Sequence, residues 1–332
     1  MDYVSRASRI PPRGSAWHHP TMASTNLYDG TLISIGTHRL FLRLQGLSRT
    51  PGQPLVIFVV GAGDVTSSYY ALARVCAFAS LLLYDRTGLG RSEDSPPPYH
   101  PSATLAAKEL HILLNNASLP PPYILVGHSY GAIIAREYLH LFSDELSGMV
   151  LVDGSTERQH ELFQDPELDI NAVLGDLNFA RVTGLRDNAR LSREQWRARA
   201  IAIARGSEMW AAEGRTLVTA CQTLGGKEQY RTKALGNRPL SVIRCRGSLD
   251  YRRVYEKGVE AGNGSERQRE AFRRLLERWD DVDQAMQEEQ LGLSERSRMV
   301  YLECGHQVHL VRPDVVAQEV KWAMEESVRG KL

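Results

Sequence analysis

The stretch Tyr123-Ile-Leu-Val-Gly-His-Ser-Tyr-Gly131 decides the fold of this chain. Its apolar run ends in Gly-x-Ser-x-Gly and passes directly into a helical pattern from Ala132 to Phe142. The pattern predicts a strand, a tight turn with Ser129 at its tip, and a helix. Glycine suits positions 127 and 131, because a side chain at either one would collide with the neighbouring strand or helix.

This turn makes Ser129 the candidate nucleophile. A turn of this kind lifts the hydroxyl clear of the sheet, beside N–H groups at the start of the helix whose positive partial charge suits a developing oxyanion. Gly-x-Ser-x-Gly alone is a weak signal, since chance would supply one in a chain of this length about one time in ten. The strand before it and the helix after it are what indicate a catalytic turn.

The composition is that of an ordinary globular protein. The chain has 332 residues, of which 42% are hydrophobic and 24% charged, enough for a large core and an added subdomain. A net charge of +1, with both signs interspersed, argues against a nucleic-acid partner. No apolar run is long enough to span a membrane, and the sequence does not indicate an oligomeric state.

The ends of the chain and its cysteines bear on localisation. The first residues lack a basic segment followed by an apolar one, and the four cysteines are scattered without a Cys-x-x-Cys pair. We therefore expect a cytoplasmic protein with reduced thiols. The C-terminal Gly330-Lys331-Leu332 differs from the peroxisomal signal Ser-Lys-Leu at its first residue, which leaves a peroxisomal address as a weak alternative.

Strands and helices alternate along the first half of the chain. Two short alternating runs, 31–35 and 39–44, predict an antiparallel pair, and the apolar runs 55–60 and 80–84 predict strands covered on both faces. Helical patterns at 67–78 and 103–116 separate these strands from one another and from the opening stretch. The expected fold class is α/β, with a mostly parallel central sheet and helices on both faces.

The strand pattern stops after Gly154 and resumes at Pro239. Polar helical stretches such as 192–211 lie between, which predicts an inserted helical cap. We expect an N-terminal arm at 1–24, a core in two parts at 25–154 and 239–332, and the cap at 155–238. Within the second core part, the sequence predicts a strand at 239–245, a helix at 265–290, a strand at 299–302 and a helix at 313–328.

A serine nucleophile needs a base within hydrogen-bond reach and an acid that orients the base. His306 follows the last strand, and Asp250 lies just past the strand that ends at Cys245. Because the carboxyl ends of parallel strands share one edge of a sheet, these residues can meet Ser129 there. Asp153, which ends the preceding core strand, is the alternative acid, and we favour Asp250 by its position.

Three motifs together resemble the α/β-hydrolase superfamily, in its capped branch of esterases and lactonases. They are Gly-His-Ser-Tyr-Gly, Asp85-Arg-Thr-Gly-Leu-Gly-Arg-Ser92 and Gly305-His-Gln-Val-His-Leu-Val-Arg-Pro313, and the likeness covers roughly residues 28 to 328. The resemblance implies a triad of Ser129, Asp250 and His306. More loosely, the chain resembles hydrolases of fungal natural-product pathways, which implies secondary metabolism and a polyketide-type substrate.

The oxyanion hole is expected to use the N–H of Tyr130 and a second N–H from the loop after the strand at 55–60. That loop reads Gly61-Ala-Gly-Asp64, and the second donor is placed at Ala62, with Gly61 and Gly63 beside it. The family commonly has His-Gly at this point, whereas this chain has Val60-Gly61. A backbone donor does not need that histidine.

Two further residues are predicted to bind substrate. His128 flanks the nucleophile, and Trp210 lies in the cap, whose aromatic residues indicate a mainly apolar pocket. His306-x-x-His309 has the spacing of a metal pair, but the sequence shows no third ligand, so His309 is interpreted as a packing or supporting residue. No cofactor and no metal is implied.

The sequence therefore predicts a serine hydrolase that cleaves an apolar, small-molecule ester or lactone through an acyl-enzyme. Two alternatives stay open. The same triad could pass an acyl group to an internal nucleophile, as a transferase or cyclase does, or cleave a carbon–carbon bond. A non-catalytic binding protein on the same fold is the other class, and an intact set of Ser, His and Asp argues against it.

Overall fold

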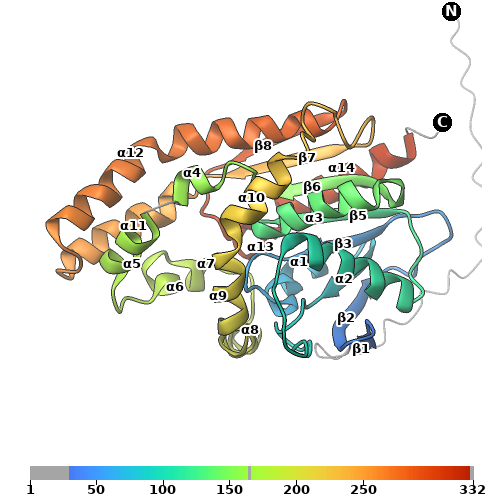
Figure 1. The fold of residues 1–332 in the computed structure, drawn as a ribbon, viewed down its shortest axis with the longest axis horizontal. Helices are drawn as coiled ribbons and strands as arrows, with labels where there is room; N and C mark the ends of the chain where they lie inside the picture. Colours follow the sequence, from blue (N-terminus) through green and yellow to red (C-terminus); the bar gives the residue numbers. More distant parts are fainter. Residues whose placement is uncertain (1–29, 164–165, 330–332) are drawn as a thin grey trace, which may run out of the picture.

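The computed structural model describes residues 30–163 and 166–329. Within these residues one eight-stranded sheet runs in the order β1-β2-β4-β3-β5-β6-β7-β8 (Figure 1). β1 pairs antiparallel with β2, and β2 antiparallel with β4, while the remaining neighbours are parallel. The strands are β1 Thr31–Ser34, β2 Arg39–Gly46, β3 Leu55–Val59, β4 Ser80–Tyr84, β5 Tyr123–His128, β6 Leu146–Val152, β7 Leu240–Cys245 and β8 Ser297–Leu302.

Helices cover both faces of this sheet, which confirms the predicted α/β fold. Alternate residues of β3 point to opposite sides: Leu55, Ile57 and Val59 belong to one apolar cluster, and Val56 and Phe58 to the other. The first cluster includes α2 (Ala103–Asn116) and α3 (Tyr130–Leu141), and the second includes α1 (Tyr70–Val75) and α14 (Pro313–Arg329). Because both faces are buried, the strand is continuously apolar.

Most predicted helices are present, and two of them are divided. The pattern at 67–78 forms the 3-10 helix η1 (Thr66–Tyr69) followed by α1. The pattern at 192–211 forms α8 (Arg193–Arg205) and α9 (Ser207–Arg215), which meet at Gly206. Gly206 lies against the loop after β4, where an added Cβ would come 2.7 Å from Leu89 Cδ2, so the break lets the two helices seat on this loop.

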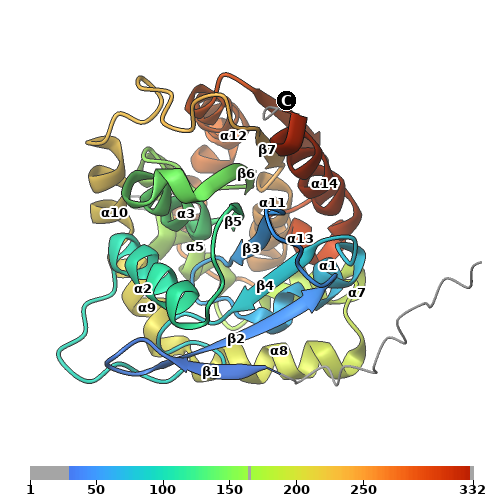
Figure 2. The same cartoon turned by 90° about the vertical axis from the view of Figure 1, so that its right-hand side faces the viewer.

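The segment predicted as a cap is helical, as expected (Figure 2). After β6 the chain has no strand until β7 in the described residues. Besides α8 and α9, this region holds α4 His160–Phe163, α5 Pro166–Leu174, α6 Phe179–Val182, α7 Leu185–Asn188 and α10 Leu217–Gly225.

A second helical insertion lies between β7 and β8. It consists of α11 (Ser248–Glu260) and α12 (Glu266–Glu289), of which only α12 was predicted. Both pack against α5 and share a separate apolar cluster with it, away from the two clusters of the sheet (Figure 1). The cluster is made of Leu162, Ile170, Val173, Val254, Phe272, Leu275, Leu276, Trp279 and Met286. The helical layer thus draws on both insertions, so the second core part at 239–332 contains helices that pack on the predicted cap.

Some predictions fall outside the described residues, namely the N-terminal arm and the C-terminal Gly330-Lys331-Leu332. Among the helices that the structure describes, none is both long and apolar enough to cross a membrane. The remaining short elements are the 3-10 helices η2 (Ser143–Glu145) and η3 (Gln290–Leu293), and α13 (Val308–Val311).

Candidate active site

Ser129 occupies a strained turn between β5 and α3. Its backbone has φ 52° and ψ −126°, a conformation that residues other than glycine rarely adopt. Both flanking glycines are required by contact. A Cβ at Gly131 would lie 2.0 Å from the carbonyl oxygen of Val59, and one at Gly127 would lie 2.8 Å from the Cα of Ala132. The predicted strand-turn-helix is therefore confirmed, with Ser129 at its tip.

The ring of His306 is bound by Asp153. Nδ1 of His306 lies 2.5 Å from Oδ2 of Asp153, and the histidine side chain is 32% exposed. The other carboxylate oxygen, Oδ1, accepts a hydrogen bond of 2.8 Å from the backbone N–H of Cys245 in the next strand. Asp153 directly follows β6 with a positive φ of 44°. This local bend and the bond to β7 aim its carboxylate at the histidine.

Asp250 meets His306 at a different atom. Its Oδ2 accepts a hydrogen bond of 3.0 Å from the backbone N–H of His306. The carboxylate packs on the residue before the histidine, since a Cβ at Gly305 would lie 2.1 Å from Oδ2 of Asp250. This is a correction to the preference for Asp250, because the ring nitrogen meets the alternative acid, Asp153. Helix α11 begins at Ser248, three residues after β7 ends at Cys245, and Asp250 lies in its first turn.

The electrostatics suit a base that gains a proton during a reaction. Burial disfavours the charged ring of His306, but the hydrogen bond and charge of Asp153, with the charge of Asp250, outweigh it and raise the pKa of His306 above its usual value. Burial also raises the pKa of Asp250, against the N–H that it accepts. The nearby carboxylates would thus stabilise an imidazolium.

Ser129 and His306 are brought to the same edge of the sheet. The residue before the nucleophile, His128, contacts His306 directly: Nε2 of His128 lies 3.1 Å from the carbonyl oxygen of His306, and the two ring centroids are 4.8 Å apart. Among the described residues, the hydrogen bonds of His306 go to His128, Asp250 and Asp153, and none joins its Nε2 to the Ser129 hydroxyl. In enzymes without bound substrate, the contact between a serine nucleophile and its histidine base is often long, and it shortens when substrate binds.

The predicted oxyanion loop lies beside Ser129. A Cβ at Gly61 would come 3.3 Å from the Cβ of Ser129, which places this loop against the turn from Gly127 to Gly131, called the elbow below. The N–H groups of Ala62 and Tyr130 donate no hydrogen bond to any residue in the described ranges. Gly63 differs, because its N–H donates to Oε2 of Glu213 at 2.8 Å. This is a correction to the prediction for Gly63, because its N–H is bound to Glu213 and is not free to meet an oxyanion.

His128 is not a pocket wall. Its side chain is only 2% exposed, and its Nδ1 lies 3.1 Å from the hydroxyl of Tyr69, while Nε2 lies beside His306. Burial and the neighbouring histidines lower the pKa of His128 well below its usual value, so the ring is neutral. A neutral ring can donate from Nε2 to the His306 carbonyl and accept at Nδ1 from Tyr69. This is a correction to its predicted role in substrate binding.

His309 is buried behind His128 and pairs with Asp64. Its Nε2 lies 3.4 Å from Oδ2 of Asp64, and its ring stacks on Tyr69 with centroids 4.3 Å apart. Asp64, His128 and His309 offer ligand atoms within 4.8 Å of one another, so they could in principle hold a metal. Both ring nitrogens of His128 already have partners, and Arg199 lies 4.0 Å from Asp64. With its two ring nitrogens occupied, His128 has no nitrogen free for a metal, so we interpret the trio as a buried polar cluster behind His306.

Trp210 lies over the oxyanion loop. It is 57% exposed, and a Cβ at Gly63 would come 2.5 Å from its Cγ. Helix α9 thus carries the tryptophan to the edge of the catalytic region. This placement is compatible with the predicted contact to substrate.

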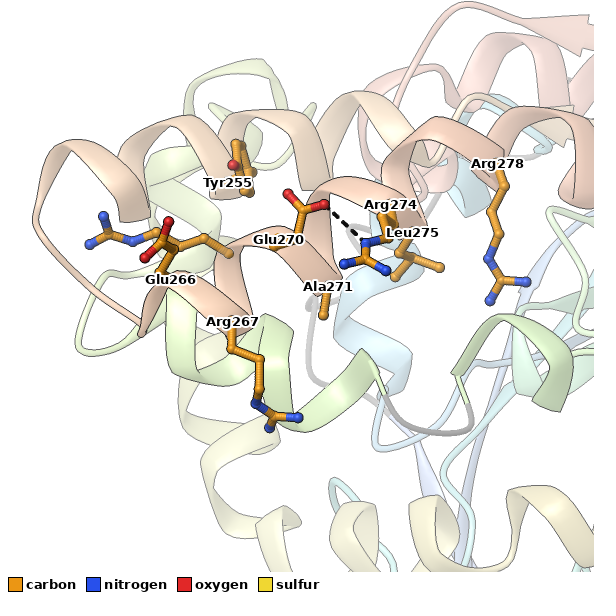
Figure 3. Close-up of a pocket in the computed structure, with 9 residues that line it drawn as sticks. Tyr255, Glu266, Arg267, Glu270, Ala271, Arg274, Leu275 and Arg278 are labelled. Carbon is orange, nitrogen blue, oxygen red and sulfur yellow. Dashed lines mark hydrogen bonds and ion pairs between the residues drawn. The ribbon is translucent and has the colours of Figure 1, made fainter.

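A hollow of about 930 Å³ lies elsewhere, between α11 and the N-terminal half of α12. Figure 3 shows its lining of arginines and glutamates, in which Arg274 Nε binds Glu270 Oε1 at 3.0 Å. None of the triad candidates lines it. Figure 1 places this end of α12 far from the sheet, so the hollow is separate from the candidate active site.

Comparisons with known proteins agree with the α/β fold described above. The sequence profile described as the Alpha/beta hydrolase family matches residues 56–319. An "AB hydrolase superfamily protein" of Gibberella zeae is 31% identical over 297 residues, which cover 85% of this chain and 90% of that protein.

Two other similarities are informative. The "Probable transporter efuK" of Hormonema carpetanum is 31% identical over 303 residues, which cover 89% of this chain and 42% of that protein, so the chain spans less than half of that relative. Among solved structures, the enol-lactonase from Burkholderia xenovorans LB400 is 13% identical with a TM-score of 0.56, covering 89% of this chain and 100% of that one. At this identity, the likeness shows the fold alone.

Proposed function

The chain belongs to the alpha/beta hydrolase family, and we propose that it is a serine hydrolase that opens an ester or lactone through Ser129, His306 and Asp153. The observation that carries the proposal is the contact of 2.5 Å between His306 Nδ1 and Asp153 Oδ2, at the edge of the sheet that presents Ser129. A carboxylate at Nδ1 holds the ring with Nε2 available to a serine.

The first half of the reaction forms an acyl-enzyme. Ser129 Oγ attacks the carbonyl carbon of the substrate while its proton passes to His306 Nε2. The oxyanion receives hydrogen bonds from the N–H groups of Ala62 and Tyr130. The tetrahedral intermediate then collapses, the bond to the leaving oxygen breaks, and that oxygen takes the proton from His306.

The second half releases the acid. Water gives a proton to His306 Nε2 and attacks the acyl carbon, and the bond to Ser129 Oγ breaks as the serine recovers the proton. Asp153 stabilises the imidazolium in both halves without being protonated itself. Trp210, exposed over the oxyanion loop, supplies apolar surface for the substrate.

A fluorophosphonate probe tests the nucleophile. We expect wild type to be labelled on Ser129, and Ser129→Ala to remain unlabelled. Equal labelling of the two proteins, or an unlabelled wild type, would refute the proposal.

Ester or lactone substrates turned over in ¹⁸O-water test the second half. One ¹⁸O in the acid product supports hydrolysis. An acyl product without the label would instead support transfer or cyclisation on the same triad.

A further inference from the structure

Two charged side chains from distant parts of the chain meet at the oxyanion loop. Arg86 follows β4, and Glu213 lies on α9 of the helical cap. The guanidinium binds the carboxylate in a bidentate manner, with Nε–Oε1 at 2.8 Å and Nη2–Oε2 at 2.9 Å. The two side chains are only 3% and 5% exposed. This is a buried ion pair between the core and the cap.

Both members of the pair also bind the backbone of the loop. Arg86 donates to the carbonyl oxygens of Val60 at 2.6 Å and Gly61 at 2.8 Å, and Glu213 accepts the N–H of Gly63 at 2.8 Å. These contacts lie on both sides of Ala62, whose own N–H has no partner in the described part of the chain. The pair therefore orients the peptide units around the proposed oxyanion donor.

Fold stability does not by itself require such a pair. Taking two charges out of water costs free energy, and apolar side chains of similar volume often stabilise a protein as well or better. A bidentate pair has fixed geometry, which apolar packing lacks. Here the pair forms hydrogen bonds with three backbone groups of one loop: the carbonyls of Val60 and Gly61 and the N–H of Gly63.

The surrounding contacts seat α9 in one register on the catalytic loops. Arg205, at the end of α8, donates to the carbonyl oxygen of Ser92 at 2.9 Å. A Cβ at Gly88 would lie 2.9 Å from Cε of Met209. Trp210 covers Gly63 in the same way. Glu213 is therefore delivered to the loop by the docked cap.

We propose that Glu213 is a positioning residue: with Arg86, it makes the docked cap part of the oxyanion hole. The inference rests on the proposed function, because it concerns the same acyl transfer. Through these contacts, the seated helix α9 fixes the peptide units on both sides of Ala62, whose N–H is the proposed donor.

Glu213→Gln is the test, compared with Glu208→Gln, an exposed glutamate on the same helix. The glutamine keeps an oxygen for Gly63 N–H but loses the charge that holds Arg86. We expect kcat on a p-nitrophenyl ester and the rate of fluorophosphonate labelling to fall about 100-fold, in the range of a lost oxyanion donor, with KM little changed. Glu208→Gln should match wild type. Hydrogen–deuterium exchange of residues 60–64 should rise only in Glu213→Gln.

Wild-type kinetics and exchange in Glu213→Gln would overturn this inference. A parallel variant, Glu213→Asp, keeps the charge but shortens the arm, and we expect it to lose activity as well. If neither variant folds, the pair serves stability, which also overturns the inference. The proposed function is judged separately by wild type against Ser129→Ala. If wild type is unlabelled, that function fails, while deuterium exchange still reports whether Glu213 holds the loop.

Discussion

His306 Nδ1 lies 2.5 Å from Oδ2 of Asp153, whereas Asp250 binds the backbone N–H of the same histidine. Two carboxylates thus bind the same histidine, one at its ring and one at its backbone N–H. Asp153 orients the imidazole ring, and Asp250 holds the backbone of the loop that carries His306.

The two carboxylates differ in their expected importance for catalysis. Asp153→Asn removes the partner of the ring and favours the wrong tautomer, so kcat on an activated ester should fall by about 10⁴. Asp250→Asn keeps an oxygen that can accept the His306 N–H, so the loss should be much smaller. Steady-state kinetics of both variants decide the assignment. The opposite ranking would show that Asp250 is the acid.

The pH profile reports the charge around His306. The base must be neutral to accept the serine proton, and its pKa lies above the usual 6.5 because of Asp153 and Asp250. The acidic limb of kcat/KM is therefore expected to have its midpoint above 6.5. Asp250→Asn removes one negative charge, which should move the midpoint to lower pH. A midpoint that stays in place or rises would contradict the electrostatic argument.

The elbow glycine is expected to be indispensable. In Gly131→Ala the new Cβ would lie 2.0 Å from the carbonyl oxygen of Val59, so the strand or the turn must shift. We expect the free energy of unfolding in urea to fall by about 1–3 kcal/mol, and the labelling of Ser129 to be lost.

Gly214→Ala is the matched control for that glycine. Position 214 lies in α9, with nothing within 4 Å of an added Cβ. Alanine there should leave labelling intact and raise the free energy of unfolding by up to about 1 kcal/mol. If Gly131→Ala kept both the unfolding free energy and the Ser129 labelling of wild type, the close contact with Val59 would not be required.

His128 is expected to act through His306, the proposed base. His128→Ala leaves the buried Tyr69 hydroxyl and the His306 carbonyl without their shared partner, at a cost of about 1–3 kcal/mol in unfolding free energy. Because the His128 side chain is only 2% exposed, we expect kcat to fall while KM changes little. The exposed His100→Ala serves as the control. A raised KM with normal kcat would instead restore the substrate-binding role.

The local sequence predicts the strained turn that carries Ser129, because the information lies within nine residues. A β-branched apolar run, two glycines and a following helical pattern are enough to place Ser129. The alternation of strands and helices likewise predicts a parallel sheet, and hence one edge where the ends of β5, β6, β7 and β8 meet. His306 follows from its place directly after the last of these strands.

The choice of acid could not be read from the sequence. Asp153 and Asp250 both follow strands that end at this edge, so spacing alone does not separate them. What separates them is a positive φ of 44° at Asp153 and the start of α11 two residues before Asp250. Neither feature has a strong local signal. The role of His128 was missed for the same reason, since its partners Tyr69 and His306 come from other elements.

By itself, the sequence determined the α/β class and the turn that carries Ser129, because short-range periodicity and glycine sterics act within a few residues. Only the tertiary structure decided which carboxylate meets the imidazole and which cap residue reaches the oxyanion loop. Glu213 lies 150 residues from Gly63 along the chain. A buried ion pair over that separation is created by how the layers pack, and packing depends on all the elements at once.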